Sequence, residues 1–179
     1  MVIPVFYSEK MNTDFSSFSP SAGKPAQVVE AWQGLGVPMT LIEPEPVSVK
    51  QLKLAHCPRY VEQILSCEIK NGFGNTLPAV AATLAYTSGA MLSAARHAIL
   101  HQTVAVAPCS GFHHAGYASG FGYCTFNGLM VTALALQAEG LANRVGILDF
   151  DMHHGDGTDA LIEHHQAASW IEHYSAGRD

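Results

Sequence analysis

The fold class is decided by the segment VGILDFDMHHGDG, which occupies residues 145–157. Its first part, residues 145–150, is a short apolar run of the kind that forms a buried strand. The polar part, residues 149–157, therefore begins at the carboxyl end of a strand. In open α/β sheets that end of a strand is where ligands bind.

The rest of the chain alternates similar strands with helical patterns. Proline suits the first turn of a helix, where its missing N–H is harmless, and three of the helical patterns begin with one. The alternation predicts an α/β fold with a parallel sheet flanked by helices on both faces. The further strands are expected at residues 2–7, 38–42, 103–107 and 170–174, and the helices at residues 25–35, 48–55, 58–68, 78–100 and 126–140.

Composition narrows the class of protein. The chain has 179 residues, of which 48% are hydrophobic and 13% charged, enough for one domain with a sizeable core. Its net charge is -6, and its nine Lys and Arg residues are scattered, so we expect no nucleic-acid partner. The four cysteines form no CxxC pair, which argues against a cysteine-based zinc knuckle.

The chain gives no sign of membrane targeting. Its first residues, MVIPVFY, lack the basic start and long apolar run of a signal peptide. No uninterrupted apolar stretch reaches the length of a membrane span. We therefore expect a cytoplasmic protein without membrane association.

Asp149, Asp151 and His153 are the first candidate site residues. Side chains at every second position of an extended segment point the same way, so these three are expected on one side. Two carboxylates and an imidazole suit Zn²⁺ or another first-row divalent ion. The alternative is a strand-to-helix connection whose carboxylates cap a helix.

A second candidate is the pair His113 and His114, which follows the strand expected at residues 103–107. An imidazole can accept a proton near neutral pH, as amide hydrolysis requires. Each ring could donate one N–H to a carboxylate, Asp149 or Asp156, and keep its other nitrogen for chemistry. A core histidine bonded to a backbone carbonyl is the ordinary alternative.

Three segments together resemble consecutive signature blocks of the histone deacetylase family. They are GFHHA at residues 111–115, GYCTFN at residues 122–127 and DFDMHHGDGT at residues 149–158. Residues 20–28 and the segment HCPRYV at residues 56–61 resemble earlier elements of the family. The resemblance implies an arginase/deacetylase type of fold, of which residues 1–179 would be the N-terminal part of a single domain.

The resemblance also implies roles for individual residues. The zinc ligands would be Asp151 and His153, and a structural K⁺ would lie near Asp149, Asp151 and His153. His114 would act as general base and acid, His113 as an electrostatic helper, and Asp149 and Asp156 as their carboxylate partners. Gly122 and Tyr123 would line the channel for the acylated side chain.

The implied reaction is zinc-dependent hydrolysis of an N-acetyl or other N-acyl amide on a lysine or polyamine-like amine, by His-assisted attack of metal-bound water. The family's third zinc-binding Asp and its transition-state Tyr come after the point where this chain stops, so we expect this chain alone to be incomplete and barely active. An incomplete sheet would leave an exposed edge, open to a homo-oligomer or another association. The alternatives are a non-catalytic truncated module and an arginase-like ureohydrolase.

Overall fold

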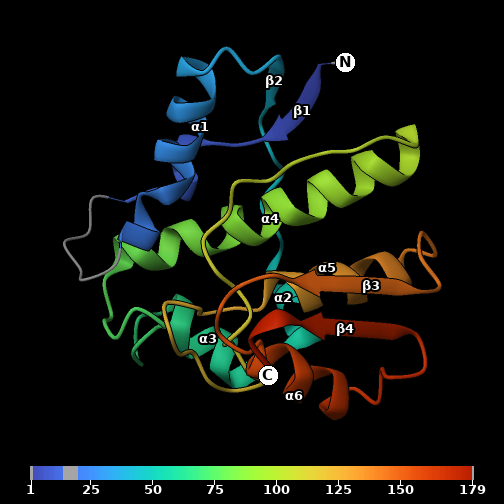
Figure 1. The fold of residues 1–179 in the computed structure, drawn as a ribbon. Coiled ribbons are helices and arrows are strands. Elements are labelled where there is room, and N and C mark those ends of the chain that lie inside the picture. The colour runs from blue at the N-terminus through green and yellow to red at the C-terminus, as the bar shows by residue number, and fades with distance from the viewer. Residues whose placement is uncertain (1, 14–19, 179) are drawn as a thin grey trace.

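The computed structural model describes residues 2–13 and 20–178. In this part of the chain the strands form two parallel pairs. β1 (Ile3–Phe6) pairs with β2 (Met39–Ile42), and β3 (Val145–Asp149) pairs with β4 (Ile171–Ser175). Figure 1 shows helix α4 (Pro78–His101) crossing between the two pairs.

The full strand predicted at residues 103–107 is wrong. This segment meets β1 only through an isolated parallel bridge between Val106 and Val5. Val106 accepts a hydrogen bond from the N–H of Phe6 (2.7 Å) and donates one to the carbonyl of Pro4 (2.9 Å). No described strand flanks the segment on its other side, so its pairing stops there. The described residues thus hold two strand pairs instead of one continuous sheet.

The five predicted helices are confirmed, with ends shifted by a few residues. Local chemistry explains where several begin. Pro58 and Pro78 each occupy the first turn of a helix, and Ser48 forms a capping box with Gln51. The helices are α1 (Lys24–Gly34), α2 (Val49–Ala55), α3 (Pro58–Leu65), α4 and α5 (Gly128–Ala138), and short 3₁₀ turns lie at Glu9–Met11, Pro20–Ala22 and Ala176–Arg178.

A sixth helix, α6 (Asp156–His164), was not predicted. Gly155 and Gly157 flank its first residue and apolar residues are few near its start, so the periodic pattern is weak. Two acidic residues, Asp156 and Asp159, lie in its first turn, where they favour the positive end of the helix dipole. Leu161 and Ile162 bury its apolar face.

Helix α4 connects two hydrophobic clusters. Its Leu84 and Leu92 pack with residues of α5, β3, β4 and α6, whereas its Ala90 and Ala94 pack with residues of β1 and α1. Gly89 lets the segment 45–47 cross α4, because a Cβ there would lie 2.2 Å from the carbonyl oxygen of Glu45. The two strand pairs are therefore fixed relative to each other through one long helix.

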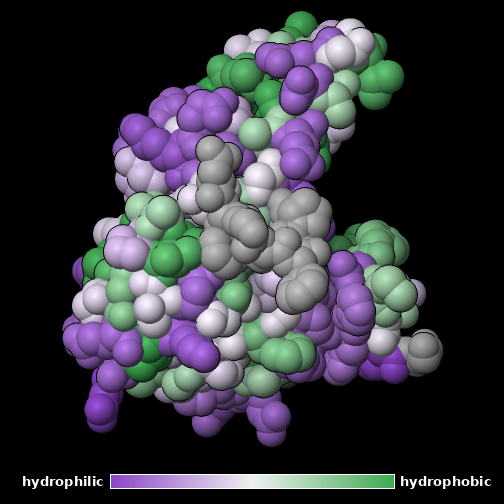
Figure 2. Space-filling view, turned by 90° about the vertical axis from the view of Figure 1, so that its left-hand side faces the viewer, coloured by the Kyte–Doolittle hydropathy of each residue, from purple (hydrophilic) through white to green (hydrophobic). Residues whose placement is uncertain are grey.

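Among the residues described, no helix is both long and apolar enough to cross a bilayer. Figure 2 shows hydrophilic and hydrophobic residues interspersed on the face that carries α1. Several large exposed apolar side chains lie together at the end of β3 and on β4, where Leu148, Phe150 and Tyr174 are 69%, 75% and 56% exposed.

Candidate active site

Two histidine–carboxylate pairs form the centre of the site. Nδ1 of His113 lies 2.7 Å from Oδ2 of Asp149, and Nδ1 of His114 lies 2.6 Å from Oδ1 of Asp156. The predicted pairing is thus confirmed. An ionised carboxylate can only accept a hydrogen bond, so each Nδ1 is the donor, and in a neutral imidazole Nε2 then keeps a lone pair. The rings lie side by side, with centroids 4.1 Å apart.

Three separate segments bring these four residues together. The histidines follow the segment bridged to β1, Asp149 ends β3, and Asp156 begins α6. The N–H of Thr158 donates to the carbonyl of His113 (3.0 Å), which ties α6 to the histidine loop. Only a glycine fits at Gly157, because a Cβ would lie 2.5 Å from the carbonyl carbon of His114.

The carboxylate of Asp156 is held in its charged form. Burial by itself raises the pKa of Asp156, but the hydrogen bonds from His114 and from the backbone of Gly157 outweigh it, so the pKa lies below its usual value. An ionised Asp156 stabilises positive charge on His114. This is the electrostatic arrangement that a general base needs as it takes up a proton.

Asp151 and His153 lie together, but not for the reason predicted. β3 ends at Asp149, and the chain then turns instead of continuing as an extended strand. Oδ1 of Asp149 accepts the N–H of Asp151 (3.0 Å), and Oδ1 of Asp151 accepts the N–H of His153 (2.8 Å). These side chain-to-backbone bonds form successive Asx turns, which replace the alternation of a strand.

The geometry of this pair suits a shared metal ion. Oδ1 of Asp151 lies 3.0 Å from Nδ1 of His153, and their side chains are 50% and 66% exposed. Two ligand atoms on one tetrahedral zinc lie about 3.3 Å apart. The pKa of Asp151 is lowered, first by the hydrogen bond from the backbone N–H of His153, so this carboxylate is ready to bind a cation. The described residues contain no group of three or more such ligands.

The histidines and the Asp151–His153 pair share the wall of one hollow of about 450 Å³. The ring centroid of His114 lies 5.9 Å from that of His153 and 5.4 Å from that of Phe121. The hollow is therefore polar on one side and partly aromatic on the other. It is lined by Ser21, Lys24, Gly111, His113, His114, Phe121, Gly122, Tyr123, Cys124, Asp151 and His153.

Gly122 and Tyr123 have an unusual backbone. Both adopt positive φ, 54° and 65°, and for the non-glycine Tyr123 this conformation is strained. A Cβ at Gly122 would lie 2.6 Å from Cδ2 of His114, so a glycine is needed for the loop to pass this ring. The next residue, Cys124, is buried, and burial raises its pKa to about 11, which makes it a poor ligand or nucleophile at neutral pH.

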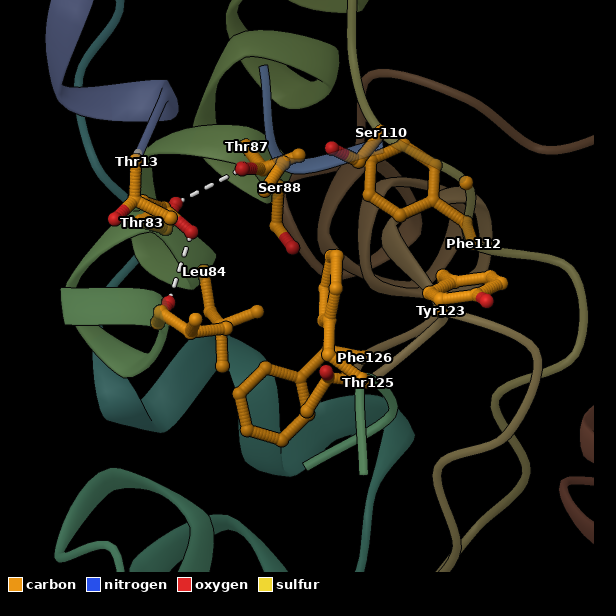
Figure 3. A pocket seen from close by; sticks show the side chains of 14 residues that line it. Thr13, Thr83, Leu84, Thr87, Ser88, Ser110, Phe112, Tyr123, Thr125 and Phe126 are labelled. Atoms are coloured by element: carbon orange, nitrogen blue, oxygen red, sulfur yellow. Dashed lines mark hydrogen bonds between the residues drawn. The ribbon is translucent and has the colours of Figure 1, made fainter. Parts of the chain in front are cut away.

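A second, smaller cavity lies behind the histidine loop. It holds only about 20 Å³, which is room for about one water molecule. Figure 3 shows the rings of Phe112, Tyr123 and Phe126 around it, opposite α4, where Thr87 donates to the carbonyl of Thr83 (2.9 Å). The cavity is too small for a substrate, and its aromatic walls support the loop that carries the site.

Sequence reasoning missed a polar cluster beside Asp149. Asp159 accepts hydrogen bonds from His173 (2.7 Å), His154 (2.8 Å) and Arg178. Ile171, His173 and Ser175 alternate on the inner face of β4, which pairs in parallel with β3. The sequence did contain a signal for this cluster. His173 alternates with two buried residues on a strand next to the one that ends at Asp149.

Comparison with known proteins identifies the family of the chain. The histone deacetylase domain matches residues 21–178. An uncharacterized protein of Picosynechococcus sp. strain PCC 7002 is 34% identical over 135 residues, which cover 69% of this chain and 44% of that protein. Histone deacetylase 8 of Xenopus tropicalis is 25% identical over 177 residues, 88% of this chain and 47% of that protein.

A solved structure, that of the HDA15 HD domain, superimposes with a TM-score of 0.81 at 21% sequence identity, over 98% of this chain and 54% of that one. This similarity confirms the predicted α/β fold of the arginase/deacetylase type. The chain belongs to the histone deacetylase family, and it spans about half the length of these relatives.

Proposed function

We propose that these residues form part of the active site of a zinc-dependent deacetylase. Its substrate would be an N-acetyl or other N-acyl amide on a lysine or a polyamine-like amine. One observation carries the proposal: two histidines, each oriented by a carboxylate at 2.7 or 2.6 Å, line the same hollow as Asp151 and His153. Membership of the histone deacetylase family supports it.

Each residue then has a distinct task. Asp151 and His153 would hold the zinc, which when bound polarises an acyl carbonyl and lowers the pKa of a coordinated water. His114 would take a proton from the attacking water and pass it to the leaving amine. His113 would stabilise the negative charge that develops nearby, and Tyr123 with Phe121 would contact the alkyl part of the substrate.

The proposal also includes a structural cation site. A monovalent cation such as K⁺ would bind near Asp149, Asp151 and the carbonyl of His153. Gly177 approaches that carbonyl closely, since a Cβ there would lie 2.6 Å from its oxygen. The unfolding temperature, measured in K⁺ and in the same concentration of tetramethylammonium, tests this site. We expect it to be higher in K⁺.

We also propose that further polypeptide packs against the edge of β3 that pairs with no strand in the described part of the chain. A groove of about 240 Å³ runs beside this strand, between it and helices α4 and α5. Its lining is almost entirely apolar, and Leu148 is exposed at its margin. The HDA15 HD domain is about twice as long as the part that this chain matches, which supports an occupant from the same fold.

The decisive experiment is a deacetylase assay on acetyl-lysine peptides and acetylated polyamines. We expect little or no turnover by residues 1–179 and chelator-sensitive turnover by a polypeptide that also supplies a third zinc ligand and an oxyanion donor. Missing one such donor costs on the order of 10²- to 10³-fold. In the active form His114→Ala should lower kcat by about 10²- to 10⁴-fold.

His97→Gln is the matched control, because His97 lies on α4 beside Phe6, with ring centroids 5.4 Å apart, away from the hollow. Its kcat should equal that of the unmodified enzyme. Full activity of His114→Ala would refute the role of His114. Absence of turnover in every form, with zinc bound, would favour a non-catalytic module.

A further inference from the structure

His173 is a buried histidine for which the proposed reaction has no direct use. It lies on β4, and its side chain is only 2% exposed. The ring sits between two carboxylates, that of Asp159 and that of Asp149. Figure 1 shows β4 beside β3, the strand that ends at Asp149.

The two ring nitrogens of His173 have different environments. Nδ1 lies 2.7 Å from Oδ1 of Asp159, a normal hydrogen bond. Nε2 lies 3.9 Å from Oδ2 of Asp149, too far for one, and this buried nitrogen has no hydrogen-bond partner among the described residues. Since buried polar atoms are nearly always paired, an unpaired one beside a reacting group calls for an explanation.

The same oxygen of Asp149 connects His173 to the site. Oδ2 of Asp149 is the atom that lies 2.7 Å from Nδ1 of His113. His173 therefore faces the carboxylate that orients His113, without itself lining the hollow. A shift of less than 1 Å would bring Nε2 of His173 within hydrogen-bond distance of Asp149.

The surroundings restrict how these side chains can move. Asp159 is fixed by three donors, His154, His173 and Arg178. Gly155 packs over both partners, because a Cβ there would lie 2.5 Å from Oδ2 of Asp149 and 2.9 Å from Cε1 of His173. The N–H of Gly155 is in turn bonded to Ser175 on β4 (3.0 Å). The ring of His173 is thus held at a set distance from Asp149.

We propose that His173 is a positioning residue. Anchored by Asp159, it fixes the carboxylate of Asp149 and through it the ring of His113. The inference rests on the proposed function in one respect, that His113 belongs to the reacting site. Loss of His173 should then disturb the orientation of His113 even where the fold is intact.

Two substitutions separate this role from simple packing. In His173→Asn the amide takes the place of Nδ1 and keeps the bond to Asp159, whereas in His173→Gln it takes the place of Nε2, the nitrogen that faces Asp149. Both are compared in the complete natural polypeptide with zinc, by ¹⁵N NMR of the His113 ring, by kcat and KM, and by thermal unfolding. His97→Gln serves as the control for the substitution itself.

We expect His173→Asn to change the ring ¹⁵N shifts of His113 and to lower kcat by about 10- to 100-fold with little change in KM. His173→Gln should lie closer to the unmodified protein in both measurements. If His173→Asn leaves the His113 shifts and kcat unchanged, or if both variants lose activity only in proportion to unfolding, the inference is wrong. An unmodified protein without deacetylase activity, but with the same NMR response, would refute the proposed reaction and leave the positioning role standing.

Discussion

At the scale of single residues, the site depends on histidines held by carboxylates far away in sequence. His113 and Asp149 are 36 positions apart, and His114 and Asp156 are 42 apart. Each pair leaves one ring nitrogen available for chemistry. His56, in contrast, is a structural histidine that is fully buried. Its Nδ1 lies 2.9 Å from the carbonyl oxygen of Gly116, and its Nε2 accepts the N–H of Asn127 (2.8 Å).

Zinc binding gives the first prediction at this scale. Residues 1–179 should bind zinc weakly, because Asp151 and His153 supply one ligand fewer than the usual three. Asp151→Ala should weaken binding by at least ~10-fold, measured by competition with a chromophoric chelator. Glu172→Ala is the control, since Glu172 is an exposed residue of β4 that pairs with Arg144. Zinc affinity that survives Asp151→Ala would place the metal elsewhere.

His56 gives the second prediction. Burial lowers its pKa to about 4, whereas a histidine in an unfolded chain has a pKa of about 6.5. As the pH falls below about 6.5, His56 becomes protonated in the unfolded chain but stays neutral in the folded protein. The free energy of unfolding therefore decreases until about pH 4. The expected loss is on the order of 2–3 kcal/mol.

Urea unfolding at pH 7 and pH 4.5 measures this effect. His56→Gln should be less stable at pH 7, because it loses contacts of the imidazole, but its stability should depend less on pH over this range. An equal pH dependence in the two proteins would show that other groups dominate acid unfolding.

At the scale of elements, helix α4 organises the molecule and α6 completes the site. The sequence marks the start of α4 with a proline, and Gln102 ends it in the left-handed conformation, with φ of 51°. α4 is also tied to the end of α5 by Arg96, which binds both carboxylate oxygens of Glu139. Such a two-point contact fixes the angle between side chains better than a single ion pair does.

Glu139→Gln tests the contribution of this contact. Hydrogen bonds from Arg96 lower the pKa of Glu139, so its stabilising effect is present above the unfolded value of about 4.3 and is lost as the pH falls. The side chains are 31% exposed, and solvent screening limits the effect to about 0.5–1 kcal/mol at pH 7. Urea unfolding should show this difference at pH 7 and none near pH 3. A difference that persists at pH 3 would point to packing instead of charge.

At the scale of the whole molecule, the described residues hold two strand pairs joined by one helix. The pair β3–β4 exposes one face, on which Leu148 and Tyr174 project, and Phe150 follows at its end. Exposed apolar area of this kind is unusual in a folded monomer, and it is the surface on which we proposed that further polypeptide packs.

Self-association is the prediction at this scale. Residues 1–179 alone should associate at micromolar concentrations, and Leu148→Lys should shift sedimentation velocity profiles toward the monomer. Leu35→Lys is the control, because Leu35 is 80% exposed at the end of α1, outside the groove beside β3. Equal association of the two variants would place the contact on another surface.

The sequence by itself determined the family and five of the six α-helices in the described residues, and it predicted the residues of the site. Helix ends depend on nearby residues, such as Ser48 with Gln51, and are therefore readable in the sequence. The pairing of His113 with Asp149 and of His114 with Asp156 followed from the needs of an imidazole and from the resemblance to the family. Their catalytic roles stay predictions.

Only the tertiary structure decided how strands and side chains meet across the fold. Whether residues 103–107 form a strand depends on neighbours distant in sequence, and here a single bridge at Val106 results. Asp151 and His153 come together through Asx turns, which compete with the strand and which periodicity does not reveal. The place of His173 between Asp149 and Asp159 arises from the register of β4 against β3 and the start of α6, because long-range packing alone fixes such distances.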